Sequence, residues 1–309
     1  MEAITFALFA KPGRAEQETL LFTKSLRQFG GIYKNAPVWV MTLESSPLSK
    51  DTVTQLEKYR VQLQTVELAE DLINFPFAVK SMIAGLAETL IKGTSQLLVW
   101  LDRDSLIIQE PNELILPAGK TLGYRPVDHK NIGSPYDEPP DDFWETLYQH
   151  NQVSPDKVFP ILTSVDQIHL RPYINAGMLV VRPEAGLLHQ WGSAFNKIYQ
   201  HPEITPYYEI HPLYKIFIHQ AVLSAMLTHV LPFEEWFELP YQINYPLHMH
   251  KNYPTQKKPK DIHQVVTCRY DTFFEDKNWQ EQISLPDPFG SWLLHNISPL
   301  LDSIAKEIH

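Results

Sequence analysis

Apolar runs and amphipathic segments alternate through the first hundred residues, and this order restricts the possible folds more than any other feature of the chain. The apolar runs are typical of strands and lie at residues 3–10, 36–43, 61–68 and 97–101. The segments between them have helical spacing and lie at residues 15–31, 48–60 and 77–93. Turn pairs of the hairpin type do not separate the runs. Strands joined through helices require right-handed crossovers, so the pattern predicts an α/β fold with a mostly parallel, doubly wound sheet.

Composition restricts the class of protein. The chain has 309 residues, 44% of them hydrophobic, which is ample for a large core. Its formal net charge is -10 and it contains no long basic run, so we expect no nucleic-acid partner. The single cysteine, Cys268, allows no intrachain disulfide. The first ten residues lack a basic leader region, and no apolar run approaches the ~18 residues that a membrane span needs. We therefore expect a cytoplasmic protein without a membrane span.

The stretch "QLLVWLDRDSLII", at 96–108, places two carboxylates directly after a strand that is apolar on both faces. Such a strand is typical of the centre of a parallel sheet, and ligands bind beyond the carboxyl ends of these strands. If the extended chain continues, Asp102 and Asp104 point to one side and Arg103 points away. The two carboxylates would repel each other, and Mn²⁺ or Mg²⁺ would relieve that repulsion. The alternative interpretation is a helix cap followed by a solvated turn.

Two chemistries use a strand followed by Asp-x-Asp. One is that of phosphatases of the haloacid dehalogenase type, in which Asp102 would be the nucleophile. Ser105 and Leu106 depart from that motif, which also normally lies on the first strand of its domain. The other is the binding of a sugar nucleotide, in which the carboxylates hold a cation that bridges the diphosphate. A non-catalytic binding protein is the third hypothesis.

The second half of the chain contains three further motifs in a fixed order. They are a strand that begins at Asn175-Ala176-Gly177, a helix that carries His219-Gln220, and a strand and loop with Leu239-Pro240 and Asn244; they lie at 171–191, 214–227 and 229–245. Together with Asp-x-Asp, these motifs resemble the retaining GT-A glycosyltransferases that include glycogenin and bacterial galactosyltransferases. The resemblance covers about residues 3–250.

This resemblance implies a Rossmann-type, GT-A-like fold with helices on both faces of a mostly parallel sheet. We expect one domain over 1–309, with a core at about 3–250 and a C-terminal extension at about 251–309 that packs back on it. The implied reaction moves a sugar from a nucleotide-sugar donor, expected to be UDP-linked, to a hydroxyl of an unknown glycan, protein or small-molecule acceptor. The implied cofactor is Mn²⁺ or Mg²⁺.

The resemblance also assigns roles to individual residues. Asp102 and Asp104 would bind the cation, and Asp102 would also approach the ribose of the donor. Lys80, on the preceding helix, would contact the donor. Asn175 would lie near the transferred sugar and Gln220 near the anomeric carbon. A solvated lysine and a glutamine on an amphipathic helix are the competing structural interpretations of Lys80 and Gln220.

Several departures from the family pattern stand out. His219 occupies the position of a carboxylate that usually binds sugar hydroxyls. The first loop, "AKPGR", lacks the usual Asp and Tyr, although Lys11 and Arg14 could meet a diphosphate. Gly177 could belong to a tight turn before its strand, as could Asn175, but we assign both to the donor site.

The third metal ligand of the family is a histidine in a pattern like H-x-x-G-x-x-K-P-W. Residues 265–279 keep Lys277 and Trp279 but have Thr267-Cys268 near the expected histidine. We take His295 as the substitute ligand. His248 and His250 would share one side of a strand, and we interpret them as structural. The polar, proline-rich segment 128–144 is interpreted as a surface loop that could cover an acceptor site.

Overall fold

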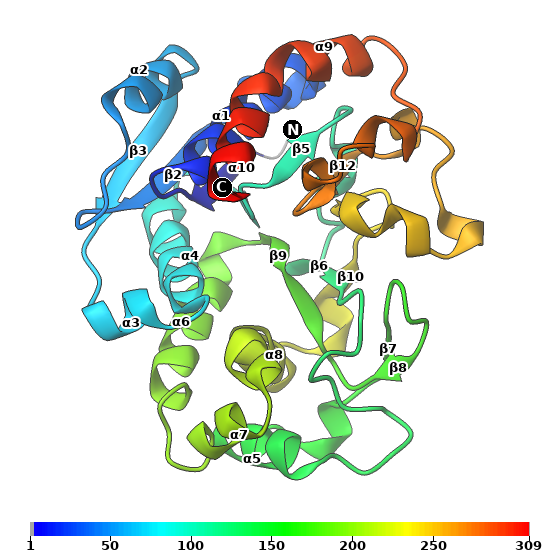
Figure 1. Cartoon of the computed structure of the whole chain (residues 1–309). Coiled ribbons are helices and arrows are strands. Elements are labelled where there is room, and N and C mark those ends of the chain that lie inside the picture. Colours follow the sequence, from blue (N-terminus) through cyan, green and yellow to red (C-terminus); the bar gives the residue numbers. More distant parts are fainter. Residues whose placement is uncertain (1–2, 309) are drawn as a thin grey trace.

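A seven-stranded mixed sheet lies at the centre of the computed structural model, which describes residues 3–308 (Figure 1). The strand order is β10-β6-β9-β4-β1-β2-β3. The strands of this sheet are β1 (Ile4–Phe9), β2 (Val38–Leu43), β3 (Val61–Val66), β4 (Leu97–Leu101), β6 (Leu122–Pro126), β9 (Ile174–Val181) and β10 (Trp236–Glu238). The predicted strands at 3–10, 36–43, 61–68 and 97–101 are therefore confirmed.

Helices cover both faces of the sheet, because its central strands are buried on both sides. On one face, the core includes residues of α1 and α2 and alternate strand residues such as Phe6 and Leu8. On the other face, it includes residues of α4, α6 and α8 with the intervening Ala7. The helices are α1 (Arg14–Phe29), α2 (Lys50–Lys58), α3 (Glu70–Asn74), α4 (Ala78–Ile91), α5 (Asp142–His150), α6 (Leu187–Ile198), α7 (Thr205–Ile210), α8 (Pro212–Val230), α9 (Phe289–Asn296) and α10 (Ser298–Ile308). Within residues 3–308, none of them is long and apolar enough to cross a membrane.

The direction of β9 decides where its first residues lie. β9 runs antiparallel to both of its neighbours, β4 and β6, whereas the other pairings in this sheet are parallel. Leu101, the last residue of β4, lies opposite Met178. The start of β9 is thus placed beside the carboxyl end of β4, and two distant sequence motifs come together at one edge of the sheet.

The C-terminal segment joins the N-terminal half through a second, three-stranded sheet. In this sheet β12 (Thr267–Arg269) pairs with β11 (Tyr245–Pro246) and with β5 (Ser105–Ile107), and a separate two-stranded sheet contains β7 (Ile161–Leu162) and β8 (His169–Leu170). Helix α10 packs on α1, as Figure 1 shows. The sequence did not indicate β5, because three residues carry no measurable periodicity.

Local expectations are partly confirmed. Ser49 caps α2, since its side chain accepts a hydrogen bond from the Thr52 amide. The expected strand around 248–250 is wrong, because these residues form a short 3₁₀ helix (Leu247–Asn252). His250 Nδ1 lies 2.9 Å from the Tyr245 hydroxyl, whereas His248 faces Asp271. The two imidazoles therefore have different partners.

Helices α4 and α6 pack at close range and hold a buried carboxylate between them. A Cβ atom at Gly85 would lie 3.0 Å from the backbone of His189, so a larger residue would push the two helices apart by a few tenths of an ångström. Glu88 is 1% exposed and accepts a hydrogen bond from the His189 amide at 2.8 Å. Burial raises the pKa of Glu88 to about 7, although hydrogen bonds from backbone amides at the start of α6 oppose the shift.

We expect the Glu88→Gln variant to be more stable than the wild type above neutral pH. Folded Glu88 holds its proton up to a pKa of about 7, whereas the unfolded group has the usual value of 4.5. The wild type therefore loses up to about 3 kcal/mol of folding free energy as pH rises from 4.5 through 7. Glutamine keeps an acceptor oxygen without the charge. Denaturant unfolding of both proteins at pH 5 and pH 8 measures the effect. If their difference in the free energy of unfolding were the same at the two pH values, the prediction would be contradicted.

Candidate active site

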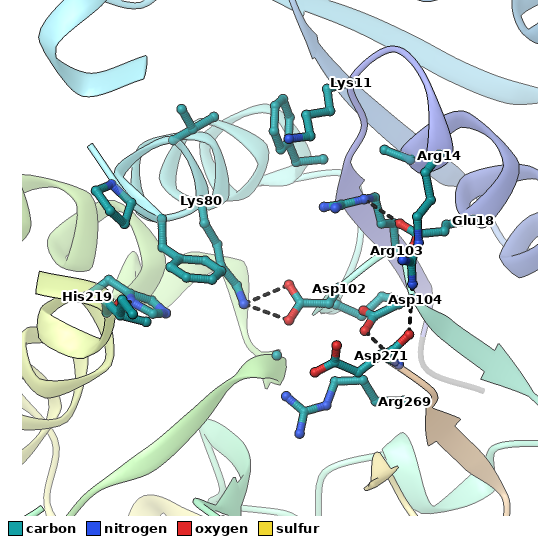
Figure 2. A pocket seen from close by; sticks show the side chains of 18 of the residues that line it. Lys11, Arg14, Glu18, Lys80, Asp102, Arg103, Asp104, His219, Arg269 and Asp271 are labelled. Carbon is teal, nitrogen blue, oxygen red and sulfur yellow. Dashed lines mark hydrogen bonds and ion pairs between the residues drawn. The ribbon is translucent and has the colours of Figure 1, made fainter. Parts of the chain in front are cut away.

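A cavity of about 960 Å³ opens at the carboxyl edge of the sheet (Figure 2). Its lining comes from the loop after β1, the start of α4, the end of β4, the start of β9, the helix α8 and the segment after β12. This cavity brings together Lys11, Arg14, Lys80, Asp102, Asp104, Asn175, Gly177 and Gln220. All of the site residues predicted from the sequence except His295 therefore line one cavity.

Asp102 is held from two sides. It follows β4 directly, and its amide donates a hydrogen bond of 2.7 Å to the Gly177 carbonyl. Its two carboxylate oxygens each lie 2.7 Å from Lys80 Nζ. Lys80 is on the first turn of α4 and only 9% exposed. The lysine therefore neutralises this carboxylate at the floor of the cavity, and it is not a solvated helix charge.

Asp104 reaches the cavity by a route that differs from the prediction. The chain turns after Leu101 instead of continuing as an extended strand, so the argument from two-residue spacing is wrong. Asp104 accepts a hydrogen bond from the Asp271 amide at 3.2 Å. Burial and the nearby carboxylate of Asp102 raise the pKa of Asp104 to about 7. Among the residues that the structure describes, Asp104 has no ion-pair partner.

Gly177 is required by the close approach of the two motifs. Asn175 and Gly177 lie within β9 and do not form a turn before it. The Gly177 amide donates to Asn175 Oδ1 at 2.6 Å. A Cβ atom at Gly177 would come within 2.7 Å of that oxygen and 2.9 Å of Asp102 Oδ2. Any larger residue would displace one of the two side chains.

Helix α8 contributes a fixed amide and a neutral imidazole. Gln220 is 7% exposed, and its Oε1 accepts a hydrogen bond from the Ala176 amide at 3.0 Å. His219 stacks on the ring of Phe77, with 4.7 Å between the ring centroids. Burial, with a further contribution from Lys80, holds the pKa of His219 well below its usual value. Gln220 is thus tied to β9, and His219 cannot replace the charge of a carboxylate.

Two arginines near the carboxylates are already paired. The Arg14 guanidinium donates to Glu18 at 2.8 Å, to Glu275 at 2.6 Å and to the Asp271 carbonyl at 2.9 Å. Arg103 Nε lies 2.7 Å from a Glu18 oxygen, and Arg103 lines the cavity, so the prediction that it is turned away from the site is wrong. Arg14 therefore fixes the segment after β12 against α1, while Lys11 lies exposed on the rim.

The prediction for His295 is wrong. This residue is exposed on α9 and does not line the cavity. Phe289 and Trp292 of α9 pack on Phe29, at the C-terminal end of α1. The cavity borders the opposite end of α1, about 22 Å away for a helix of this length. Aromatic packing at the far end of α1 therefore keeps His295 away from Asp102 and Asp104.

The sequence analysis missed Arg269 and Asp271. Arg269 lines the cavity and donates to Asp128 Oδ2 at 2.9 Å, and Figure 2 shows Asp271 next to Asp104. A signal for Asp271 was present: counting back along H-x-x-G-x-x-K-P-W from Lys277 and Trp279 gives position 271, where this chain has aspartate. By contrast, residues 128–144 do not line the cavity, so a lid role for this segment has no support.

The donor set suits a hard divalent cation. Asp102, Asp104 and Asp271 line the same cavity, and carboxylate oxygens suit Mg²⁺ and Mn²⁺. Lys80 neutralises only Asp102, which leaves the negative charge of Asp104 without a direct partner. A cation beside these side chains would supply that missing charge.

Comparison with known proteins identifies the family. The model of a Rhodobacterales glycosyltransferase domain matches residues 6–230. The chain belongs to this glycosyltransferase family. It is therefore an enzyme that transfers sugars, and the phosphatase interpretation of Asp102 is not supported. A search of curated proteins found no match.

Solved structures of three glycosyltransferases are similar to this one. Mouse xyloside xylosyltransferase 1 is 11% identical, with a TM-score of 0.46 over 87% of this chain and 98% of its own. GlyE of Streptococcus pneumoniae TIGR4 is 14% identical, with a TM-score of 0.48 over 98% of this chain and 62% of its own. The bifunctional glycosyltransferase WbbM is 13% identical, with a TM-score of 0.53 over 99% of this chain and 51% of its own. At 13% identity, the match to WbbM bears on the fold alone, and it agrees with a GT-A-like arrangement. The chain spans about half of WbbM.

Proposed function

We propose that this glycosyltransferase uses a nucleotide-sugar donor, UDP-linked, whose diphosphate binds with Mn²⁺ or Mg²⁺ at Asp102 and Asp104. The observation that carries the proposal is the meeting of these two carboxylates with Lys80 in one cavity of about 960 Å³. A cavity of this size accommodates a nucleotide-sugar, and pockets for ligands are commonly 300–1,000 Å³. The acceptor is a hydroxyl compound whose class stays open.

Asp271 is our candidate for a third protein ligand. Its backbone amide already donates to Asp104, and its own carboxylate lies beside the cavity. When bound, a divalent cation would stabilise the negative charge that develops on the diphosphate. The three aspartates would hold the cation, and solvent and the diphosphate would complete its coordination.

Lys80 and Arg269 supply the remaining positive charge. Lys80 now contacts both oxygens of Asp102, and a cation on this carboxylate would free its ammonium group for a diphosphate oxygen. Within residues 3–308, the buried Nε atom of Arg269 has no hydrogen-bond partner, and this side chain lies next to Gly177. Fixed cationic groups of this kind favour departure of a phosphorylated leaving group.

The part of the cavity lined by Phe77 suits a sugar ring. Phe77 is 49% exposed and adopts a left-handed backbone conformation, with φ of 58°. This conformation is rare for a bulky residue and presents the ring beside His219 and Lys80. Asn175 and Gln220 line the same cavity, where they could orient the transferred sugar. A retaining outcome stays a prediction from the family resemblance.

Gln220→Ala is expected to lower kcat about 10- to 100-fold and to change donor affinity little. In our assignment the amide faces positive charge that develops at the anomeric carbon, so it acts in the transition state more than in the ground state. Its hydrogen bond to Ala176 fixes the amide in place. Steady-state kinetics with calorimetric donor binding separates the two effects, and Gln190→Ala on α6 is the control. Wild-type turnover in Gln220→Ala would remove the residue from the reaction.

The proposed donor class is tested by the release of nucleoside diphosphate from UDP-sugars and GDP-sugars, with Mn²⁺, Mg²⁺ or chelator. Water can take the place of the acceptor hydroxyl in a slow hydrolysis of the donor, so the assay does not require the acceptor. We expect cation-dependent release from a UDP-sugar. Equal release in chelator, or release from a GDP-sugar alone, would contradict the cation or the UDP assignment, respectively.

A further inference from the structure

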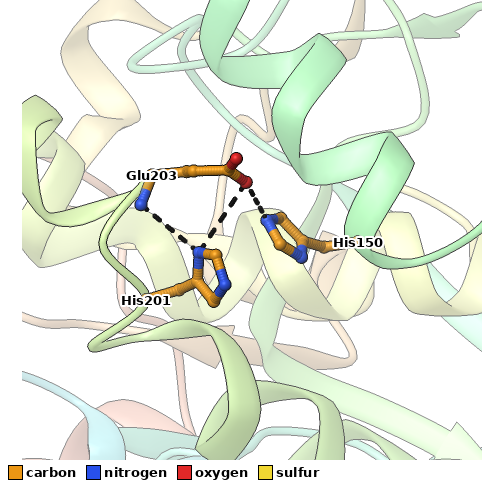
Figure 3. Close-up of side chains that lie close together, drawn as sticks. All are labelled: His150, His201 and Glu203. Carbon is orange, nitrogen blue, oxygen red and sulfur yellow. Dashed lines mark hydrogen bonds and ion pairs between the residues drawn. The ribbon is translucent and has the colours of Figure 1, made fainter.

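A second group of metal-binding side chains lies outside the active site, and we propose that it is a zinc site. It consists of His150, His201 and Glu203, none of which lines the cavity. His150 is the last residue of α5, whereas His201 and Glu203 lie in the connection between α6 and α7 (Figure 3). The proposal does not depend on the donor or on the chemistry of the active site.

The three side chains already converge on one point. One potential ligand atom of each lies within 4.8 Å of the other two. His150 Nε2 is 2.8 Å from Glu203 Oε2, and His201 Nδ1 is 3.8 Å from the same oxygen. The two imidazole rings are 4.2 Å apart between centroids. The Glu203 amide donates to His201 Nδ1 at 3.3 Å, and this long hydrogen bond would have to break for the same nitrogen to bind the ion.

Two of the separations between ligand atoms are close to those around a tetrahedral ion. Zinc bonds of about 2.0–2.1 Å to nitrogen and oxygen place neighbouring ligand atoms about 3.4 Å apart in a tetrahedron. The observed separations of 2.8 and 3.8 Å lie on either side of that value. Two histidines and a glutamate, with water in the fourth position, form a ligand set that zinc uses. Two imidazoles distinguish this group from the all-carboxylate set of the active site, which suits Mg²⁺ or Mn²⁺.

The position of the site gives zinc a structural effect. The ion would join the end of α5 to the segment that leads into α7. Both elements pack through Phe143 of α5, whose ring lies 5.2 Å from Tyr207 of α7 and 4.7 Å from Tyr214 of α8. We therefore expect zinc to stabilise the aromatic packing of α5 on α7 and on α8, the helix that carries Gln220.

Calorimetric titration of the untagged, chelator-treated chain with Zn²⁺ tests the proposal. The titration is carried out in an Asp102→Asn, Asp104→Asn background, so that the active-site carboxylates do not contribute. We expect one zinc equivalent to bind, and we expect His150→Ala, His201→Ala and Glu203→Gln each to weaken its affinity at least tenfold. His295→Ala removes an exposed histidine of α9 and should change nothing. Glu203 is the safest position for folding, since its side chain is 65% exposed.

A second measurement reports the coordination itself. Co²⁺ bound by this set should give the visible absorption of a tetrahedral complex, Zn²⁺ should remove it, and Glu203→Gln should weaken it. Zinc should also raise the melting temperature of the parent background and not that of His150→Ala. Zinc affinity and melting temperature that are unchanged in all three ligand variants would overturn the proposal.

Discussion

Replacing Asp104 with asparagine is expected to abolish cation-dependent donor binding and to lower kcat/KM by at least about 1,000-fold. The carboxylate lies in the turn after β4, where it accepts one hydrogen bond from the Asp271 amide. Asparagine keeps an acceptor oxygen for this bond but removes the charge that would hold the cation. Asparagine also removes a charge that burial disfavours, so the melting temperature of the free protein should not fall.

Calorimetry with UDP and Mn²⁺ measures this effect directly. The matched control is Asp302→Asn, which removes an exposed carboxylate of α10. We expect the control to bind UDP with wild-type affinity and Asp104→Asn to show no Mn²⁺-dependent heat. If Asp104→Asn retained the Mn²⁺-dependent affinity, the metal site would not include this residue.

The Gly177→Ala variant is expected to lose at least about 100-fold in kcat/KM with only a moderate loss of stability. A Cβ atom there would lie 2.9 Å from Asp102 Oδ2 and 2.7 Å from Asn175 Oδ1. At these separations the side chains must shift, and misplacement of a reacting group by about 1 Å can cost about 100-fold in rate.

A double-mutant cycle identifies the cause of that loss. If the methyl group acts by displacing Asp102, adding Gly177→Ala to Asp102→Asn should lower kcat/KM much less than it does in the wild type. Fully additive losses would show that Gly177→Ala acts elsewhere. Urea unfolding of the single variants shows whether the fold is retained.

Local patterns predicted most of the N-terminal half of the fold. Strands such as β4 and helices such as α4 show clear periodicity, and each lies within its predicted range. The direction of β9 was not accessible in this way, because an isolated apolar run does not specify its pairing partner. The pairing of β12 with β5 was also not predictable from the sequence, because each of these strands contains only three residues.

The sequence indicated the position of a candidate site residue where a motif was local, and did not where a contact was distant. Asp102 and Asp104 follow one strand, and that strand indicated their position. Arg14 contacts Glu275 across 261 residues of sequence, and no spacing argument reaches that far. The error at His295 has the same origin, because packing of α9 on Phe29 decides where that histidine lies.

The central claim is that a divalent cation and a nucleotide-sugar bind together at Asp102 and Asp104. The melting temperature of the wild type with UDP-sugar and Mn²⁺, added singly and together, tests it most directly. Ligand at one hundred times its dissociation constant stabilises the folded state by about 2.7 kcal/mol. We predict a rise that requires both components and disappears in Asp104→Asn. An equal rise in Asp104→Asn, or no rise with UDP-sugar and either Mn²⁺ or Mg²⁺, would contradict the account.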